Sequence, residues 1–304
     1  MPSRSDQQAV APDDSHETIA RLEVALDSAT AELDALRRSR TFRYTARLRA
    51  GYARARGLVR QTDGAAAKTG DVAAPSGVGL PERRQALARR FLRGEGIEIG
   101  PLHQPLRLDP GLRVRYVDRM TVDALRSHYA ELADFDLVEP DIVCDGETLP
   151  LIPDASVDFV IANHFYEHCQ DPLTTLRNHL RVLRDGGVLY LALPDRRHTF
   201  DRDREVTPLA HVVRDFSDGP DWSRRLHFED WARNVHHMPE EAVGNEVERL
   251  LGLDYSIHFH VWEANDFLAL VLYCRAELAF PLEVEAFEQD EAEFRLIIRK
   301  VAAH

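Results

Sequence analysis

Two patterns of hydrophobic and polar positions divide the chain into a helical first part and a mixed second part. Near the start, apolar residues follow one another at intervals of three and four positions: Ile19, Leu22, Leu26, Ala29, Leu33 and Leu36. This spacing keeps one apolar stripe on a helix and is typical of a short coiled coil. Two interpretations stay open. The stripe pairs with a second copy of the chain, giving a homodimer, or it packs on the chain's own domain.

A basic segment follows this stripe. Residues 37–60 contain nine arginines and no acidic residue, although the net charge of the whole chain is −13. Apolar residues interrupt the arginines, as in surface helices that meet anionic partners. An anionic membrane surface or nucleic acid fits this pattern, and so does a solvated helical face beside an acidic domain. The acidic remainder of the chain would repel a phosphate backbone, which disfavours nucleic acid.

Composition sets the expected domain boundaries. Residues 62–81 are small, rich in Gly and Pro and without periodicity, as in flexible linkers. We therefore expect a helical coiled-coil and basic arm at 1–62, a linker at 63–80 and one domain at 81–304. The first residues do not resemble a secretory signal, and the three cysteines have no disulfide or metal-ligand spacing. These features predict a cytoplasmic protein, with the basic arm able to hold it at the inner membrane face.

After the linker, the expected elements alternate between helix and strand. Helices are expected at 82–92, 122–132, 172–183 and 263–275, and strands at 97–99, 113–117, 141–144, 157–162, 188–193 and 258–262. Alternating apolar positions at 282–287 and 294–299 predict a final hairpin. The order predicts an α/β fold with a doubly wound, mainly parallel sheet. Ligands bind such sheets beyond the carboxyl ends of the strands.

Polar residues and a glycine lie where these strands are expected to end. Gly100 would let the backbone approach a ligand closely. Asp118 could accept hydrogen bonds from two ribose hydroxyls, and Asp145 from the amine of an adenine. Each carboxylate also has a structural interpretation: Asp118 would cap the helix that begins near Thr121, and Asp145 would hold a turn.

Taken in order, the segments EIG, YVD, DGETLP, SVDFVIANHFYEH and LRVLRDGGVLYLALP resemble the successive motifs of class I S-adenosylmethionine-dependent methyltransferases. The resemblance implies a Rossmann-like sheet of seven strands and S-adenosylmethionine as the cofactor. It also implies the roles of nine residues. Glu98 and Gly100 form the first cofactor loop, Asp118 and Arg119 lie at the ribose, Asp145, Gly146 and Glu147 at the adenine, and Asn163 and His164 near the methionine part.

The first loop departs from this family's pattern. Members usually carry Glu/Asp-x-Gly-x-Gly-x-Gly, whereas Gly100 is followed here by Pro101, Leu102, His103 and Gln104. Such a loop is bulkier and stiffer. Either the cofactor is contacted differently, through His103 or Gln104, or binding has been lost. The second case gives the alternative function, an inactive methyltransferase-fold scaffold that docks a glycan-assembly partner or a membrane surface.

An insert at 195–255, between the fifth strand and the next helix, is the expected acceptor site. Its polar pairs at 195–197 and 200–204 are expected to face the methyl donor and suit a hydroxylated ligand such as a sugar. A hydroxyl acceptor would benefit from a general base, for which His168 and Asp195 are the chosen candidates, with His198 as another. No metal is predicted, because His236-His237 and His258-x-His260 come without nearby carboxylates.

The basic arm carries a second resemblance. Ser39, Phe42, Arg43, Thr45, Leu48 and Arg49 are similar to the segment Ser-x-x-Trp-Arg-x-Thr-x-Pro-Leu-Arg, with Phe42 in place of tryptophan and without the proline. That segment precedes the catalytic domains of many bacterial polysaccharide-assembly glycosyltransferases and methyltransferases. The resemblance implies O-methylation of a sugar, a glycan or another small hydroxylated acceptor, and a glycosyltransferase or membrane surface as a partner of the arm.

Overall fold

The computed structural model describes residues 79–129, 132–290 and 293–302. The predicted coiled coil, the basic arm and almost all of the linker lie outside these residues and stay predictions. The α-helices are α3 (Leu80–Phe91), α4 (Val122–His128), α5 (Pro172–Val182), α6 (Leu209–Asp218), α7 (Asp221–Asn234), α8 (Glu240–Gly252) and α9 (Ala264–Ala276), and short 3-10 turns are η2 (Tyr166–His168), η3 (Arg196–His198) and η4 (Phe200–Asp203). The strands are β1 (Glu95–Ile99), β2 (Arg113–Asp118), β3 (Ile142–Val143), β4 (Val157–Asn163), β5 (Leu183–Pro194), β6 (Leu282–Gln289) and β7 (Glu293–Lys300).

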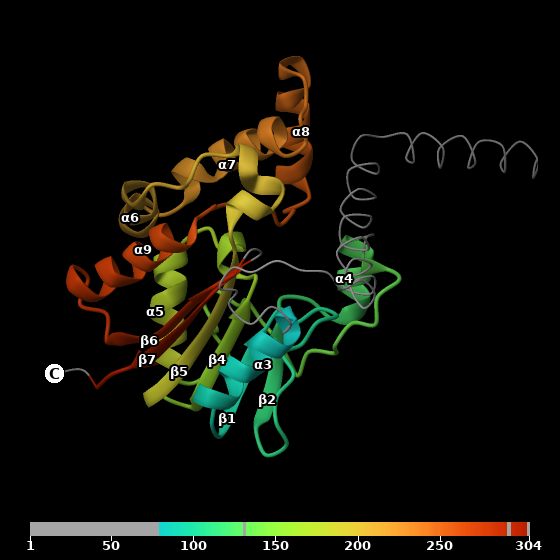
Figure 1. The fold of residues 1–304 in the computed structure, drawn as a ribbon. Coiled ribbons are helices and arrows are strands. Elements are labelled where there is room, and N and C mark those ends of the chain that lie inside the picture. Colours follow the sequence, from blue (N-terminus) through green and yellow to red (C-terminus); the bar gives the residue numbers. More distant parts are fainter. Residues whose placement is uncertain (1–78, 130–131, 291–292, 303–304) are drawn as a thin grey trace, which may run out of the picture. The chain divides into compact units, whose positions relative to one another are not determined.

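The strands form one seven-stranded sheet in the order β3-β2-β1-β4-β5-β7-β6 (Figure 1). β1 to β5 pair in parallel, and β7 runs antiparallel to both β5 and β6. The order steps outward from β1 in both directions, which is the doubly wound arrangement predicted from the sequence. The predicted final hairpin, β6 and β7, is also confirmed.

Helices cover both faces of the sheet. On one face, Leu87 and Ala88 of α3 pack with Phe159 of β4 and Tyr190 of β5 in a buried apolar cluster. On the other face, α5 and α9 contribute to the largest cluster, in which Leu176 and Phe267 are among the buried members. Almost every residue of β4 and of the second half of β5 is buried, as expected for central parallel strands covered on both sides. The result is a three-layer αβα domain.

The connection from β1 to β2 contains no helix. Parallel neighbours need a long crossover, which is usually helical. Residues 100–112 instead form a loop, and Pro101, Pro105 and Pro110 explain why: proline removes a backbone donor and disfavours a helical conformation in the residue before it. The first loop therefore differs from the family pattern in its secondary structure as well as in its glycines.

One predicted strand is wrong. Residues 258–262 are buried but pair with no strand. Their backbone groups bond with loops instead: the His260 N–H donates to the Glu167 carbonyl at 3.3 Å, and the Thr207 N–H donates to the Val261 carbonyl at 2.9 Å. The alternation of apolar residues that suggested a strand reflects burial beneath the insert.

The insert is helical and lies beyond the carboxyl end of β5. It contains η3, η4, α6, α7 and α8, which stand together on that side of the sheet before the chain returns through α9 (Figure 1). Within the described ranges, no helix is both long enough and apolar enough to cross a membrane.

Candidate active site

The candidate cofactor residues follow four adjacent strands at the same edge of the sheet. Ile99 pairs with Val117 of β2 and with Ala162 of β4, and Asp118 pairs with Val143 of β3. Because these strands are parallel, their carboxyl ends lie side by side. The polar residues and glycines that follow each strand are thus brought to one edge, as the sequence predicted.

Gly100 begins the loop after β1 in a left-handed conformation. Its φ is +60°, and a Cβ added there would meet nothing within 4 Å. Its N–H donates to the Val117 carbonyl at 2.9 Å, which fixes the backbone to β2. Glycine is required here for conformation, since other residues adopt this φ at a cost. The open space beside it is available to a ligand.

Glu98 anchors the first loop. Both oxygens of its buried carboxylate accept the Leu106 N–H, at 2.9 Å and 3.1 Å. Burial raises the pKa of Glu98 to about 7, while the Leu106 N–H and the neighbouring Asn163 side chain act in the opposite direction. The side-chain oxygen of Asn163 is buried without a hydrogen-bond partner within the described part of the chain. Glu98 therefore shapes the loop, and Asn163 has an unused acceptor at the strand ends.

Asp118 is mostly buried at the end of β2. One oxygen accepts the Met120 N–H at 3.3 Å, and a carboxylate can accept further hydrogen bonds. Burial raises its pKa. The interpretation of Asp118 as a helix cap is wrong, because Thr121 Oγ1 accepts the Ala124 N–H and caps α4.

Arg119 turns toward the insert. Its guanidinium donates to the Tyr129 hydroxyl at 2.7 Å and lies 3.4 Å from Asp254 Oδ2. Asp254 follows α8 and also accepts from Arg224 of α7 at 2.6 Å. Arg119 thus links the end of β2 to the end of the insert.

The segment after β3 forms a turn. Asp145 Oδ1 accepts from the Thr148 N–H at 2.8 Å and from the Thr148 hydroxyl at 3.0 Å, so the turn interpretation of this residue holds. Gly146 is required for close packing, because an added Cβ would lie 2.6 Å from Ile99 Cγ2. Glu147 points to α5, where Thr175 Oγ1 lies 3.4 Å away, and burial raises its pKa to about 7.

His164 lies between two carboxylates that the sequence did not single out. Its Nε2 is 3.1 Å from Glu293 Oε2, and its Nδ1 is 3.5 Å from Glu167 Oε1. Partial desolvation of His164, whose side chain is 40% exposed, lowers its pKa, but the interactions with Glu167 and Glu293 outweigh this effect and raise the pKa to about 9. His164 therefore carries a positive charge at neutral pH. Glu293 comes from β7, far along the chain, and no local motif pointed to it.

His168 is neutral. Its Nδ1 lies 3.0 Å from the Ile257 carbonyl, to which it can only donate, so its Nε2 keeps a lone pair. Burial, with the neighbouring His258, lowers the pKa of His168 to about 4. Asp171 rather than His168 caps the next helix, since Asp171 Oδ1 accepts the Thr174 N–H at 3.0 Å at the start of α5.

Asp195 is fully buried and already saturated. Its two oxygens accept from the backbone and guanidinium of Arg197, at 2.6–3.1 Å, and from Gln289 Nε2 at 3.1 Å. Burial raises the pKa of Asp195, but the hydrogen bonds and charge of Arg197 give a net lowering. This arrangement disfavours Asp195 as a proton acceptor, because a low pKa and filled acceptor positions both oppose protonation.

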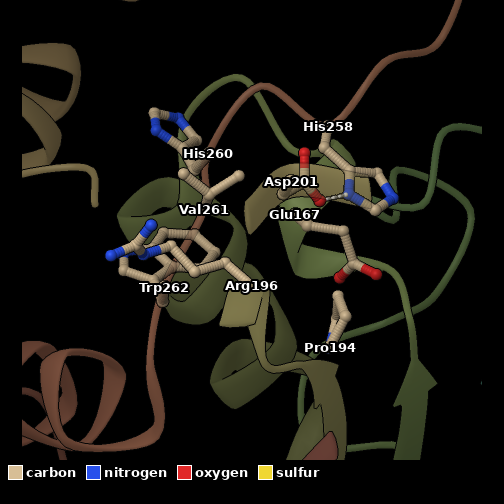
Figure 2. A pocket seen from close by; sticks show the side chains of 8 residues that line it. All are labelled: Glu167, Pro194, Arg196, Asp201, His258, His260, Val261 and Trp262. Carbon is tan, nitrogen blue, oxygen red and sulfur yellow. Dashed lines mark hydrogen bonds and ion pairs between the residues drawn. The ribbon is translucent and has the colours of Figure 1, made fainter. Parts of the chain in front are cut away.

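Two of the polar residues at 200–204, Asp201 and Arg204, do not face an open acceptor site, which corrects the expectation for them, whereas Arg202 and Asp203 are exposed. Asp201 and Arg204 are both buried and pair with each other at 2.9 Å. Asp201 also lies 2.6 Å from His258 Nδ1, and Arg204 lies 2.6 Å from Asp230 of α7. Figure 2 shows this pair of Asp201 and His258 beside Glu167, in a crevice too tight for a water molecule. These residues hold the insert together.

The structure places carboxylates beside histidines for which the sequence showed none nearby. Asp201 lies 2.6 Å from His258 Nδ1, and Asp215 lies 3.7 Å from His260 Nε2. Both carboxylates come from elements distant in the sequence. The spacing of His211 and Asp215, one helical turn apart, was a local signal that could have pointed to this region.

A family profile described as "Methyltransferase domain" matches residues 102–191. The match runs from the loop after β1 into β5, so it includes Asp118, Asp145 and Asn163 but neither Glu98 nor Gly100. A search of curated proteins gives no match.

Solved structures match most of this chain at low sequence identity. A SAM-dependent methyltransferase from Aquifex aeolicus is 12% identical, with 74% of this chain and 91% of that chain covered and a TM-score of 0.39. A SAM-dependent methyltransferase from Methanosarcina mazei is 16% identical, with 71% and 97% covered and a TM-score of 0.39. The assignment rests on the profile match together with the strand order and antiparallel β7. The chain therefore carries a class I S-adenosylmethionine-dependent methyltransferase domain, whose methyl donor is S-adenosylmethionine.

Proposed function

We propose that the protein transfers the methyl group of S-adenosylmethionine to a hydroxyl of a sugar, a glycan or another small acceptor bound beside the insert 195–255. The observation that carries this proposal is the position of the insert. Its helices stand beyond the carboxyl edge of the sheet (Figure 1). The contact of Arg119 with Asp254 ties them to that edge. An acceptor bound beside the insert would therefore face a cofactor bound at the strand ends.

Three features of this edge fit the cofactor. Gly100 leaves open space beside the backbone, Asp118 has unused acceptor capacity for the ribose, and the buried oxygen of Asn163 lacks a partner among the described residues. Asp145 is exposed after β3 and suits the adenine amine, although it also holds a turn. When bound, S-adenosylmethionine supplies a methyl group made electrophilic by the sulfonium. The chain's own residues then need to bind, orient and exclude water.

His168 is the better candidate for taking the acceptor's proton. Its Nδ1 is directed at the Ile257 carbonyl, so the lone pair of Nε2 can accept a proton. Asp195 has no such capacity, since Arg197 and Gln289 fill its acceptor positions. We propose a positioning role for Asp195, in which it fixes the chain as it leaves β5 and enters the insert.

The hydroxylated acceptor is supported by the polar residues of the insert and by the resemblance of the basic arm to polysaccharide-assembly proteins. The buried pair of Asp201 and Arg204 keeps η4, α7 and the segment around His258 in fixed positions. Exposed polar residues such as Arg197, His198 and Arg202 remain free of such burial and suit contacts with a sugar.

The test incubates the purified full chain with S-adenosylmethionine and a panel of nucleotide sugars, lipid-linked glycans, simple amines and RNA. Release of S-adenosylhomocysteine and the mass of the product identify the acceptor class. A hydroxylated glycan that gains one methyl group, with His168→Asn slower than wild type, supports the proposal. Turnover confined to amines or RNA would overturn it.

A further inference from the structure

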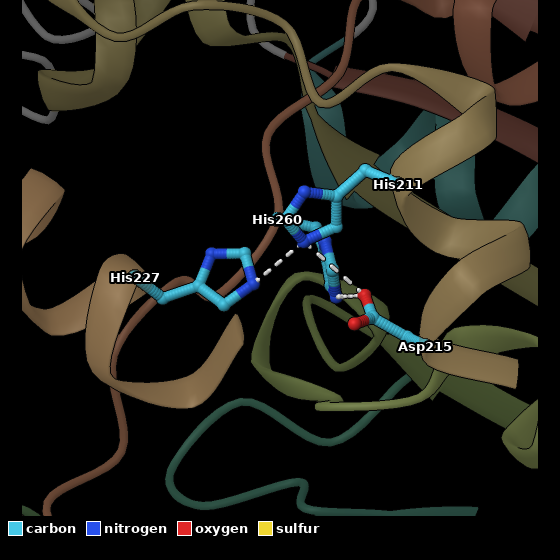
Figure 3. A group of neighbouring side chains, drawn as sticks. All are labelled: His211, Asp215, His227 and His260. Carbon is cyan, nitrogen blue, oxygen red and sulfur yellow. Dashed lines mark hydrogen bonds and ion pairs between the residues drawn. The ribbon is translucent and has the colours of Figure 1, made fainter. Parts of the chain in front are cut away.

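Four side chains with metal-binding groups converge where the insert meets the segment that follows it. His211 and Asp215 lie one turn apart on α6, His227 lies on α7, and His260 lies in the segment between α8 and α9 (Figure 3). One ligand atom from each of the four lies within 4.8 Å of the others. Three separate parts of the chain thus contribute three imidazoles and one carboxylate to a single point.

The spacing of these atoms suits a tetrahedral ion. His211 Nε2 lies 3.1 Å from His227 Nε2 and 3.3 Å from Asp215 Oδ2, and His260 Nε2 lies 3.7 Å from the same oxygen. Ligands about 2.0–2.1 Å from a zinc ion in a tetrahedron are separated by roughly 3.3 Å. Three of the six separations are therefore close to this value, and the other three are no more than 4.8 Å.

The hydrogen bonding of the cluster is incomplete without a further partner. Asp215 Oδ1 accepts from the Ser223 hydroxyl at 2.6 Å, which orients the carboxylate, but its Oδ2 is buried with no hydrogen-bond partner in the described chain. His260 Nδ1 also has no partner there, while its Nε2, the nitrogen near Asp215, lies 3.3 Å from the Gln170 carbonyl. Buried polar atoms normally have partners, and their absence indicates a missing group such as an ion.

His227 and His260 are buried and His211 is partly buried, and a neutral imidazole nitrogen can coordinate a metal ion. Asp215 supplies the single negative charge. Aromatic side chains surround the group: His211 lies against Trp222 with ring centroids 4.7 Å apart, and His260 stacks on Trp262 at 5.5 Å. This shell restricts access of water.

We propose that His211, Asp215, His227 and His260 bind one zinc ion. Imidazole nitrogens with one carboxylate suit zinc, and four protein ligands leave no coordination position for a substrate, as in structural zinc sites. The ion would tie α6, α7 and the segment before α9 into one unit. Because the His260 N–H donates to the Glu167 carbonyl and Glu167 faces His164, this unit is also attached to the carboxyl edge of the sheet.

A neighbouring group, Glu167, His168 and His258, is a weaker candidate. Its ligand atoms also lie within 4.8 Å of one another. However, His258 Nδ1 is engaged by Asp201 at 2.6 Å, and His168 Nδ1 by the Ile257 carbonyl at 3.0 Å. Each histidine thus has one nitrogen engaged, and the group offers only three ligands, so it carries no proposal although both Glu167 oxygens lack a hydrogen-bond partner among the described residues.

The test uses the full chain without a polyhistidine tag, stripped with a chelator and then dialysed against zinc. Metal content is measured by mass spectrometry, and cobalt replaces zinc in a second sample for absorption spectroscopy. We expect one zinc per chain, a thermal midpoint that falls when a chelator is added, and the intense visible bands of tetrahedral cobalt. His227→Asn and Asp215→Asn should lose the metal, whereas His198→Asn, an exposed histidine of the same insert, should keep it.

Each other outcome contradicts the proposal. A folded wild-type chain that takes up no zinc overturns it without reference to any variant, which matters if the variants unfold. Folded variants that keep a full zinc equivalent would show that the ion binds elsewhere, and an octahedral cobalt spectrum would contradict a closed site. Metal content and spectra do not depend on methyl transfer, so this result is independent of the proposed acceptor.

Discussion

The carboxylate of Glu98 accepts the backbone N–H of Leu106 at 2.9 Å, so an acidic residue of β1 fixes the loop that leads to β2. This contact stands where relatives of this type have a glycine-rich loop. It gives the helix-free segment 100–112 a defined path next to Gly100. A chain with only the first glycine of the motif can thus still present an ordered backbone at the cofactor edge.

Glu98→Gln should change how stability depends on pH. Burial raises the pKa of Glu98 to about 7. The folded state then holds this proton more tightly than the unfolded state, so the stability it contributes is lost as pH rises from about 4.5 through 7. Glutamine keeps an oxygen for the Leu106 N–H but cannot ionise. The free energy of unfolding of the variant, relative to wild type, should therefore increase between about pH 5 and pH 8 in urea titrations. A difference that stays constant across this range would refute the argument.

Gly100→Ala and Gly186→Ala form a matched pair. Both glycines have positive φ, +60° and +80°, and neither has an atom within 4 Å of an added Cβ. Each substitution should therefore reduce stability by a similar amount, about 1–2 kcal/mol. Gly186 lies before the parallel part of β5, at the opposite edge of the sheet. Only Gly100→Ala should weaken S-adenosylhomocysteine binding, by about tenfold in calorimetry. Equal affinities of the two variants would place the cofactor elsewhere.

His164→Gln should remove a pH-dependent contribution at alkaline pH. The carboxylates of Glu167 and Glu293 raise the pKa of His164 to about 9 against the effect of partial desolvation. A histidine whose pKa is raised in the folded state stabilises that state when it is protonated. This stabilisation is fully present below about pH 6.5 and is lost as the pH rises through about 9. The thermal midpoint of wild type should exceed that of the variant at about pH 6, and the gap should close by about pH 10. A gap that persists at high pH would show that the imidazole acts through packing.

His168→Asn should reduce turnover, whereas Asp195→Asn should reduce stability. His168→Asn removes the proposed general base and should reduce turnover. General bases usually accelerate a reaction by about 10²-fold to 10⁴-fold, and the low pKa of His168 makes it a weak base, so we expect a reduction of about 10²-fold. Asp195→Asn removes a buried acceptor of Arg197 and should instead lower stability by about 1–3 kcal/mol. Turnover with the identified acceptor and urea denaturation separate the two. A folded, stable Asp195→Asn protein with strongly reduced turnover would reverse these roles.

Local sequence patterns predicted the central sheet, the first helix and the terminal hairpin of the domain. The apolar runs of β4 and β5 and the polar residues after each strand indicated a parallel sheet with a site at one edge, because strand periodicity and strand ends are local properties. The length of the first helix and the terminal hairpin were also close to the structure. The strand at 258–262 failed because a buried extended segment has the same apolar pattern whether or not its backbone pairs with a neighbour.

The parts of the site that were not predicted depend on contacts between residues far apart in the sequence. Glu293 reaches His164 from β7, and Asp215 reaches His260 from another segment of the insert, so neither pairing follows from spacing in the sequence. The polar pairs of the insert were expected to face an acceptor, but the structure shows Asp201 and Arg204 neutralising each other in the interior. Residue type alone does not distinguish a buried ion pair from a binding residue.

The most direct test of the account is the affinity for S-adenosylhomocysteine, measured by calorimetry on wild type, Asp118→Ala and Asp123→Ala. Asp118 is proposed to bind the ribose, whereas Asp123 is exposed in the first turn of α4. Charged hydrogen bonds contribute about 1.5–3 kcal/mol, so Asp118→Ala should bind about tenfold to hundredfold more weakly while Asp123→Ala binds as wild type does. A folded wild-type protein with no measurable binding, or an Asp118→Ala protein that binds equally well, would contradict the proposed cofactor site.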